Sequence, residues 1–522
     1  MIENADHIDD KLTQHGIVKN TFWIYAWTFI IAPLQYLVRI VIAKNLPLDQ
    51  VGIIYALLGL TGILSLYNDL GFREAIGFYY PKYLAAKDYN KAKTILVFTL
   101  VMQLISSIIL ASLLWFFSWL IAEHYLNTPW ADMVIKIFWG YLIFNILYNF
   151  VDGVFMLYQD AFWNKIISVI NYIVLVILTL SVPYWVFKFV WVQSNLTGFI
   201  FAQIIPSIVW ISLGIFVFLK KYRKLAFRGT FTRDKAQYSS VQKYALGVLF
   251  VNNITYLLST IDVQISTYLF GPASTALYSY GMMLTNLFIT LLWPIGILLY
   301  PLISHLNARN KDEMMNSVCI RNSLQVFYAI LNYMGLIALV GSAFLWAYSS
   351  EIMTLLFGQN YAEAGSIIKR NLPFVFFGVM SGIIYTIYAG MGLIKKRIKM
   401  LVIVLIINII TNFALSTRLG IRGTALTMGL TWLILFLYGY WDLRRGWLQL
   451  KLNYKLLIKN IVVAVVTLLG LHYFIGLNAS TTLKTRELLA LNGVLFTLII
   501  WITNLGVIKN SYQVVKQLRS FK

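Results

Sequence analysis

Apolar stretches, each long enough to cross a lipid bilayer, follow one another along almost the entire chain. A spanning helix needs about 20 mostly apolar residues, and a helix satisfies its own backbone hydrogen bonds inside hydrocarbon. A soluble globule is excluded because 60% of the residues are hydrophobic and only 12% are charged, too few to cover a water-facing surface. We predict an all-α polytopic membrane protein with about 14 transmembrane helices. The predicted spans are residues 20–43, 51–70, 95–122, 132–158, 163–187, 197–219, 244–268, 275–300, 322–348, 366–392, 399–417, 423–441, 457–476 and 487–508.

The distribution of basic residues predicts the orientation of these spans. Most of the 42 Lys and Arg residues lie in alternate connecting segments, among them 73–93, 220–243, 395–399 and 444–459. Cytoplasmic loops are enriched in Lys and Arg, so we predict that these segments and both termini face the cytoplasm. This enrichment of cytoplasmic loops in Lys and Arg accounts for the net charge of +22, so the charge does not indicate nucleic-acid binding. The basic loops are expected to contact anionic membrane lipids.

Several kinds of chemistry have no support in the sequence. Cys319 is the only cysteine, which excludes an intramolecular disulfide and a cysteine metal site. The five histidines are scattered, and the chain has no Gly-x-x-x-x-Gly-Lys-Ser/Thr loop that would bind ATP. We therefore expect no metal, no cofactor and no catalytic residues.

The two halves of the chain resemble each other. Residues 43–55 (AKNLPLDQVGIIY) and 266–278 (STYLFGPASTALY) align without a gap, and each joins one span to the next through a turn that contains proline. A repeat unit with an even number of spans keeps its orientation in the membrane, so the two copies would be related by a pseudo-twofold axis along the membrane normal. The predicted parts are a cytoplasmic N-terminal segment (1–19), an N-lobe of helices 1–6 (20–219), a basic cytoplasmic linker (220–243), a C-lobe of helices 7–12 (244–441), and helices 13–14 with a cytoplasmic tail (442–522).

Four segments of the chain resemble parts of one known protein family. Residues 43–75 (AKNLPLDQVGIIYALLGLTGILSLYNDLGFREA) resemble the first two helices of polysaccharide flippases, of the O-antigen or teichuronic-acid type, and residues 260–283 (TIDVQISTYLFGPASTALYSYGMM) resemble their seventh and eighth helices. These flippases belong to the multidrug/oligosaccharidyl-lipid/polysaccharide exporter superfamily. Residues 355–364 (LLFGQNYAEA) and 418–430 (RLGIRGTALTMGL) also resemble that family. The chain departs from its pattern at the first turn, which reads Asn-Leu-Pro instead of Leu-Gly-Pro, and at Thr275, where the pattern has Gly.

Polar side chains recur at helical spacing on the first, fourth, seventh and tenth predicted spans. Such residues are costly in hydrocarbon and normally face the protein interior or a water-filled cavity. They either line a central cleft or form hydrogen bonds between packed helices, and the spacing alone does not distinguish the two. The candidate substrate or cavity residues are Gln35, Arg39, Asn145, Asn149, Asp152, Asn252, Ser259, Asp262 and Tyr385.

The charged residues of this set have more specific predicted roles. Arg39 and Asp262 occupy equivalent positions in the two repeats, so we predict that they pair as a gate at the outer mouth. Asp152 is an ion-coupling candidate, because burial of a carboxylate favours its protonated form; it could equally bind sodium or sugar hydroxyls.

The resemblance implies a substrate class and a location. The expected substrate is an oligosaccharide carried on polyprenyl diphosphate, a cell-surface polysaccharide repeat unit such as that of O-antigen in lipopolysaccharide, moved by alternating access across the cytoplasmic membrane of a prokaryote. Membrane lipids, a polysaccharide polymerase and glycosyltransferases are the expected partners. The alternatives are a cation-coupled drug antiporter of the same superfamily, a peptidoglycan-precursor flippase, and a membrane glycosyltransferase or polymerase.

Overall fold

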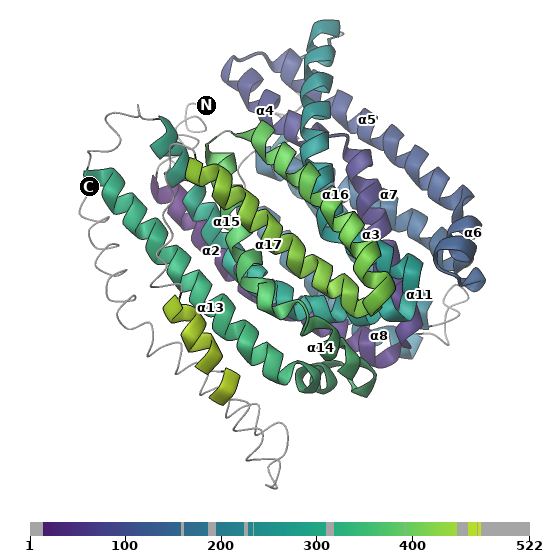
Figure 1. The fold of residues 1–522 in the computed structure, drawn as a ribbon. Helices are drawn as coiled ribbons and strands as arrows, with labels where there is room; N and C mark the ends of the chain where they lie inside the picture. The colour runs from purple at the N-terminus through teal and green to yellow at the C-terminus, as the bar shows by residue number, and fades with distance from the viewer. Residues whose placement is uncertain are drawn as a thin grey trace. The chain divides into compact units, whose positions relative to one another are not determined.

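All regular secondary structure in the part of the chain that the structure, a computed structural model, describes is helical (Figure 1). That part comprises residues 14–157, 161–185, 195–223, 228–232, 234–308, 318–391, 393–445, 458–466 and 468–470. Within it, ten helices are long and apolar enough to cross a membrane. The protein is therefore an all-α multi-pass membrane protein, as predicted. The predicted span 487–508 lies outside the described residues.

Two compact units divide the chain, residues 1–276 and 277–522. The division falls inside α11 (Lys235–Ala308), just after Gly271, whose backbone (φ 76°, ψ 176°) interrupts the helix. This is where the sequence predicted a turn between two spans. The lobes predicted from the repeat, with their boundary in the 220–243 linker, are a division of a different kind and stay a prediction.

The first unit packs its helices around α7. Neighbouring pairs are α2 with α8, α8 with α9, α7 with α9, α5 with α7, and α3 with α7. An apolar cluster of Val151, Phe155, Ile167, Trp210 and Ile211 fills the space between α7, α8 and α9. Its helices are α2 (Gln14–Asn45), α3 (Leu48–Asp69), α4 (Phe72–Ala85), α5 (Tyr89–Phe116), α6 (Ser118–Leu120), α7 (Asp132–Leu157), α8 (Ala161–Trp185), α9 (Asn195–Lys221) and the first part of α11.

A sharp corner joins α3 to α4. Leu70 (φ 49°) and Gly71 (φ 75°) both adopt the left-handed conformation, which glycine tolerates and leucine seldom adopts. A Cβ on Gly71 would lie 2.1 Å from the carbonyl oxygen of Ala245 on α11, so the corner is also packed tightly. The corner ends the spanning helix and starts α4, whose second residue is Arg73.

The N-terminal end of α3 lies against the interruption in α11. A Cβ added to Gly52 would be 1.7 Å from the carbonyl oxygen of Pro272, so the two backbones touch there. Further along α3, Gly59 faces the side chain of Gln264, and Gly62 faces the phenol of Tyr256. Small residues allow such close approach of helices in membranes. The two turns that the sequence aligns as repeats are thus neighbours in the first unit.

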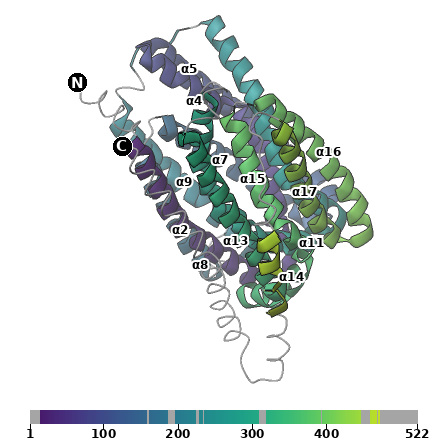
Figure 2. The same ribbon diagram turned by 60° about the vertical axis from the view of Figure 1, so that its left-hand side comes forward.

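The second unit contains a closely packed group of three helices and their neighbours. Helices α16 and α17 run side by side in both views (Figures 1 and 2), and α15 packs against α17. A buried hydrogen bond from Asn408 Nδ2 to Thr431 Oγ1 (2.9 Å) links α16 to α17. The helices of this unit are the second part of α11, α13 (Val318–Phe357), α14 (Ala362–Ile368), α15 (Val375–Gly390), α16 (Ile394–Leu419) and α17 (Ile421–Arg445).

Candidate functional site

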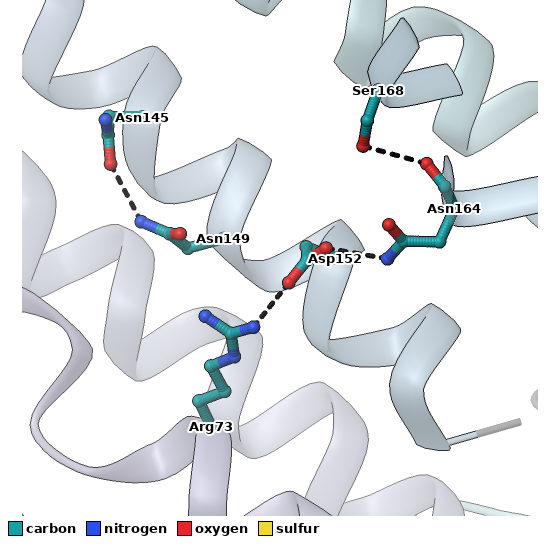
Figure 3. Close-up of polar contacts among 6 residues, drawn as sticks. All are labelled: Arg73, Asn145, Asn149, Asp152, Asn164 and Ser168. Atoms are coloured by element: carbon teal, nitrogen blue, oxygen red, sulfur yellow. Dashed lines mark hydrogen bonds and ion pairs between the residues drawn. The ribbon is translucent and has the colours of Figure 1, made fainter. Parts of the chain in front are cut away.

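A row of polar side chains follows one face of α7 (Figure 3). Asn149 Nδ2 donates to Asn145 Oδ1 at 2.7 Å. Asn145 Nδ2 donates in turn to the Tyr141 hydroxyl at 3.3 Å. The steps of four residues place these groups above one another on the helix. Asp152, three residues beyond Asn149, continues the row. The structure therefore brings together Asn145, Asn149 and Asp152, as the spacing in the sequence predicted.

The lower end of this row is an ion pair between helices. Arg73 on α4 pairs with Asp152 Oδ2, and Asn164 on α8 donates to Asp152 Oδ1 at 2.6 Å (Figure 3). The Asp152 side chain is 16% exposed and that of Arg73 is 34% exposed. Both carboxylate oxygens are thus engaged by donors from two other helices. Ser168 in turn donates to the backbone carbonyl of Asn164 at 2.9 Å.

At the upper end of the row is a cavity of about 230 Å³. Its lining comes from three helices: α3 contributes Leu58, Thr61, Gly62 and Ser65, α7 contributes Tyr141, Leu142 and Asn145, and α11 contributes Tyr256. The polar groups that line it are hydroxyls and one amide, without a charged side chain. Hydroxyls and amides both donate and accept hydrogen bonds, so the cavity suits a neutral ligand rich in hydroxyl groups.

The candidates on α2 lie close to other polar or aromatic groups of the same unit. Gln35 Nε2 donates to the Tyr172 hydroxyl on α8 at 2.7 Å. The guanidinium carbon of Arg39 lies 5.9 Å from the centre of the Tyr55 ring on α3, within the range of a cation–π interaction. Gln35 is therefore engaged in contacts between helices, while Arg39 is held near the beginning of α3.

The candidates on α11 differ in their surroundings. Asp262 is 2% exposed, so its carboxylate is buried within the first unit. Ser259 is exposed and donates to the Tyr256 carbonyl of its own helix at 2.7 Å. The side chain of Asn252 lies outside the described part of the chain. The Arg39–Asp262 gate stays a prediction.

Tyr385, the remaining candidate, belongs to α15 in the second unit. The guanidinium carbon of Arg397 on α16 lies 5.4 Å from the centre of its ring. Among the described residues, no group of three or more His, Cys, Asp or Glu side chains could hold a metal ion.

Sequence reasoning missed Arg73, Asn164 and Tyr256. Arg73 belongs to a segment that the sequence marks as a basic cytoplasmic loop, and Asn164 and Tyr256 lie in spans whose other residues are mostly apolar. A signal for Arg73 was nevertheless present, because it follows Asp69-Leu70-Gly71 by two residues. A charge directly after a helix-ending turn can reach back to a neighbouring span.

Comparisons with known proteins agree with this architecture. The model of a family described as polysaccharide biosynthesis protein matches residues 17–307. The chain belongs to this family. The resemblance stated from the helix-pair motifs is thereby confirmed at the level of the family.

Individual relatives match over most of the chain. An uncharacterised membrane protein of Methanocaldococcus jannaschii is 26% identical over 447 residues, covering 82% of this chain and 84% of the relative. Stage V sporulation protein B of Bacillus subtilis is 22% identical over 442 residues, covering 80% of this chain and 81% of the relative. The inward closed conformation of the lipid II flippase MurJ is similar in structure, with a TM-score of 0.66 and 14% identity, covering 93% of this chain and 99% of that chain. At this identity the likeness concerns the fold.

Proposed function

We propose that the protein flips a polyprenyl-diphosphate-linked oligosaccharide across the cytoplasmic membrane by alternating access, with both termini in the cytoplasm. Membership in the polysaccharide biosynthesis protein family supports this function, as does the similarity of fold to a lipid II flippase. The observation that carries the proposal is the row of neutral polar groups on α7, which begins in the cavity and ends at the Arg73–Asp152 pair.

The chemistry of the cavity favours a sugar. A volume of about 230 Å³ is below the 300–1,000 Å³ of pockets that enclose a whole drug-sized ligand, so it would hold one ring of a longer glycan. Thr61, Ser65, Tyr141, Asn145 and Tyr256 present hydroxyl and amide groups to that space. A ligand with many hydroxyls pairs with such groups, whereas a cationic drug would need carboxylates.

Flipping is tested directly in proteoliposomes. A labelled polyprenyl-diphosphate oligosaccharide is placed in the vesicles, and its protection from an added external enzyme is followed for the wild type and for two Tyr→Phe variants. Tyr141→Phe removes a hydroxyl from the cavity, and the matched control Tyr268→Phe removes the same atom from an exposed position. Loss of one neutral hydrogen bond corresponds to a rate about fivefold lower, and only Tyr141→Phe should show it. Absence of flipping by the wild type, with ion-driven efflux of a cationic dye, would refute the proposal in favour of an antiporter.

The proposed orientation has its own test. In a Cys319→Ala background, Ala86→Cys lies after α4 and His124→Cys lies between α5 and α7, both at exposed positions. A membrane-impermeant maleimide should label His124→Cys in intact cells and Ala86→Cys only in inverted vesicles. The reverse pattern would place the termini outside.

A further inference from the structure

One end of the second unit concentrates positive charge. The start of α16 carries Lys395, Lys396, Arg397 and Lys399, and the end of α17 carries Arg444 and Arg445. The two groups lie at the same end of the unit, because Lys396 Nζ contacts Asp442 Oδ1 on α17 at 3.1 Å. Six cations and one carboxylate thus lie at this end of the unit. We refer to these residues as the basic end.

The single carboxylate of the basic end is already engaged. Asp442 Oδ2 accepts a hydrogen bond from the Tyr388 hydroxyl at 2.8 Å, and Lys396 Nζ lies 3.1 and 3.2 Å from its two oxygens. Tyr388 is fully buried, whereas the Lys396 side chain is 53% exposed. Asp442 therefore neutralises Lys396 and leaves the other cations without a nearby acid from this cluster.

Arg397 is the one cation of the basic end that is partly buried rather than exposed. Its Nε is buried and has no hydrogen-bond acceptor in the part of the chain that the structure describes, and its guanidinium forms no ion pair there. The guanidinium carbon of Arg397 lies 5.4 Å from the centre of the Tyr385 ring. A half-buried guanidinium without an anion is costly, since burying a charge normally requires a partner.

The position of these cations on the helix adds to the cost. The N-terminus of an α-helix carries a partial positive charge, which disfavours Lys and Arg in the first turn, and α16 begins at Ile394, directly before Lys395, Lys396 and Arg397. The pair on α17 is different: Arg444 and Arg445 occupy the last turn, where the helix dipole favours a cation. The guanidinium carbon of Arg445 also lies 3.8 Å from the centre of the exposed Trp441 ring.

We propose that Arg397 binds the phosphate of an anionic lipid at the basic end. A guanidinium presents a planar fork of donors that matches phosphate oxygens, and the unpaired backbone N–H groups at the start of α16 favour the same anion. The phosphate belongs either to a phospholipid headgroup or to a polyprenyl diphosphate. Only the second source rests on the proposed function.

Binding to the purified full-length protein tests this site without any transport step. Native mass spectrometry in detergent gives the dissociation constants for phosphatidylglycerol, polyprenyl diphosphate and, as a zwitterionic reference, phosphatidylcholine. Arg397→Gln should weaken binding of both anionic lipids at least about tenfold, as expected for loss of a charge-assisted hydrogen bond. The matched control Arg445→Gln, which removes the same charge from the same end, should change binding less than about threefold.

Two further variants distinguish a specific phosphate site at Arg397 from non-specific attraction of anionic lipids by the positive charge of the basic end. Arg397→Lys keeps the charge but loses the planar fork, so we expect intermediate affinity. Tyr385→Leu removes the ring beside the guanidinium and should weaken binding even if Arg397→Gln fails to fold. Equal weakening by Arg397→Gln and Arg445→Gln would overturn the proposal, as would wild-type binding of phosphatidylcholine as tight as that of phosphatidylglycerol.

The affinities of the wild-type protein for the two anionic lipids show which of them carries the bound phosphate. If polyprenyl diphosphate binds more tightly than phosphatidylglycerol and inorganic pyrophosphate competes with it, the site takes the carrier diphosphate. If the two lipids bind alike, the site takes an ordinary headgroup. Either result supports the phosphate site, and the second leaves it standing should the flippase function fail.

Discussion

Replacing Gly52 by alanine should destabilise the protein, although alanine is the better helix former. The added Cβ would lie 1.7 Å from the carbonyl oxygen of Pro272, 2.3 Å from its carbonyl carbon and 2.8 Å from its Cα. All three are backbone atoms, so no side-chain rotation relieves the overlap, and the two backbones must separate by about 1.7 Å to restore ordinary contact.

The size of the effect follows from two opposing terms. Overpacking a well-packed contact costs about 3 kcal/mol at the upper end of the usual range, while Gly→Ala in a helix gains up to about 1 kcal/mol. The net loss is therefore about 2 kcal/mol. In a unit of 276 residues this lowers the unfolding temperature by about 4–8 °C.

A second glycine supplies the matched control. Gly140 lies in α7, and a Cβ added there would meet nothing within 4 Å. Gly140→Ala should therefore raise the unfolding temperature by about 2–4 °C. Thermal unfolding of the two purified variants in the same detergent gives the comparison. If Gly52→Ala is as stable as the wild type or more so, the close contact between α3 and the interruption in α11 is wrong.

Three further predictions concern the first unit. A double-mutant cycle with Arg73→Gln and Asp152→Asn, scored by unfolding in mixed detergent micelles, should give a coupling energy of about 1–2 kcal/mol, between the values of exposed and buried pairs; additive effects would argue against the pair. Asn145→Leu keeps the size of the side chain but removes the amide between the cavity and Asn149, so flipping in proteoliposomes should fall about tenfold, and an unchanged rate would remove Asn145 from the pathway. The swap Arg39→Asp with Asp262→Arg should recover more transport than either single variant; a swap as inactive as both singles would exclude direct pairing.

The sequence predicted the row on α7 because helical periodicity is a local property. Residues 145, 149 and 152 must share a face once the segment is helical, and the apolar residues around them make it helical. The class of fold follows in the same way from the length and apolarity of the spans. Both are properties of single segments, which need no knowledge of how the segments pack.

The partners of that row could not be predicted in this way. Arg73 reaches Asp152 because the chain turns sharply at Leu70 and Gly71, and Asn164 reaches it from α8. Such contacts depend on the packing of three helices, which a repeat pattern leaves open. Asp152 was assigned as an ion-coupling candidate from burial alone. Its two hydrogen-bond donors, Arg73 and Asn164, must be taken into account when the transport of Asp152 variants is interpreted.

The corner between α3 and α4 has a consequence for mutational surveys. Gly71 contacts the Ala245 backbone and sets the direction in which α4 leaves, so a side chain at this position would displace Arg73 from Asp152. A screen scored by growth or by polysaccharide output would rank position 71 beside ligand-binding residues. Scoring the amount of folded protein in parallel would separate the two groups, because a residue that only directs the backbone loses abundance and output together.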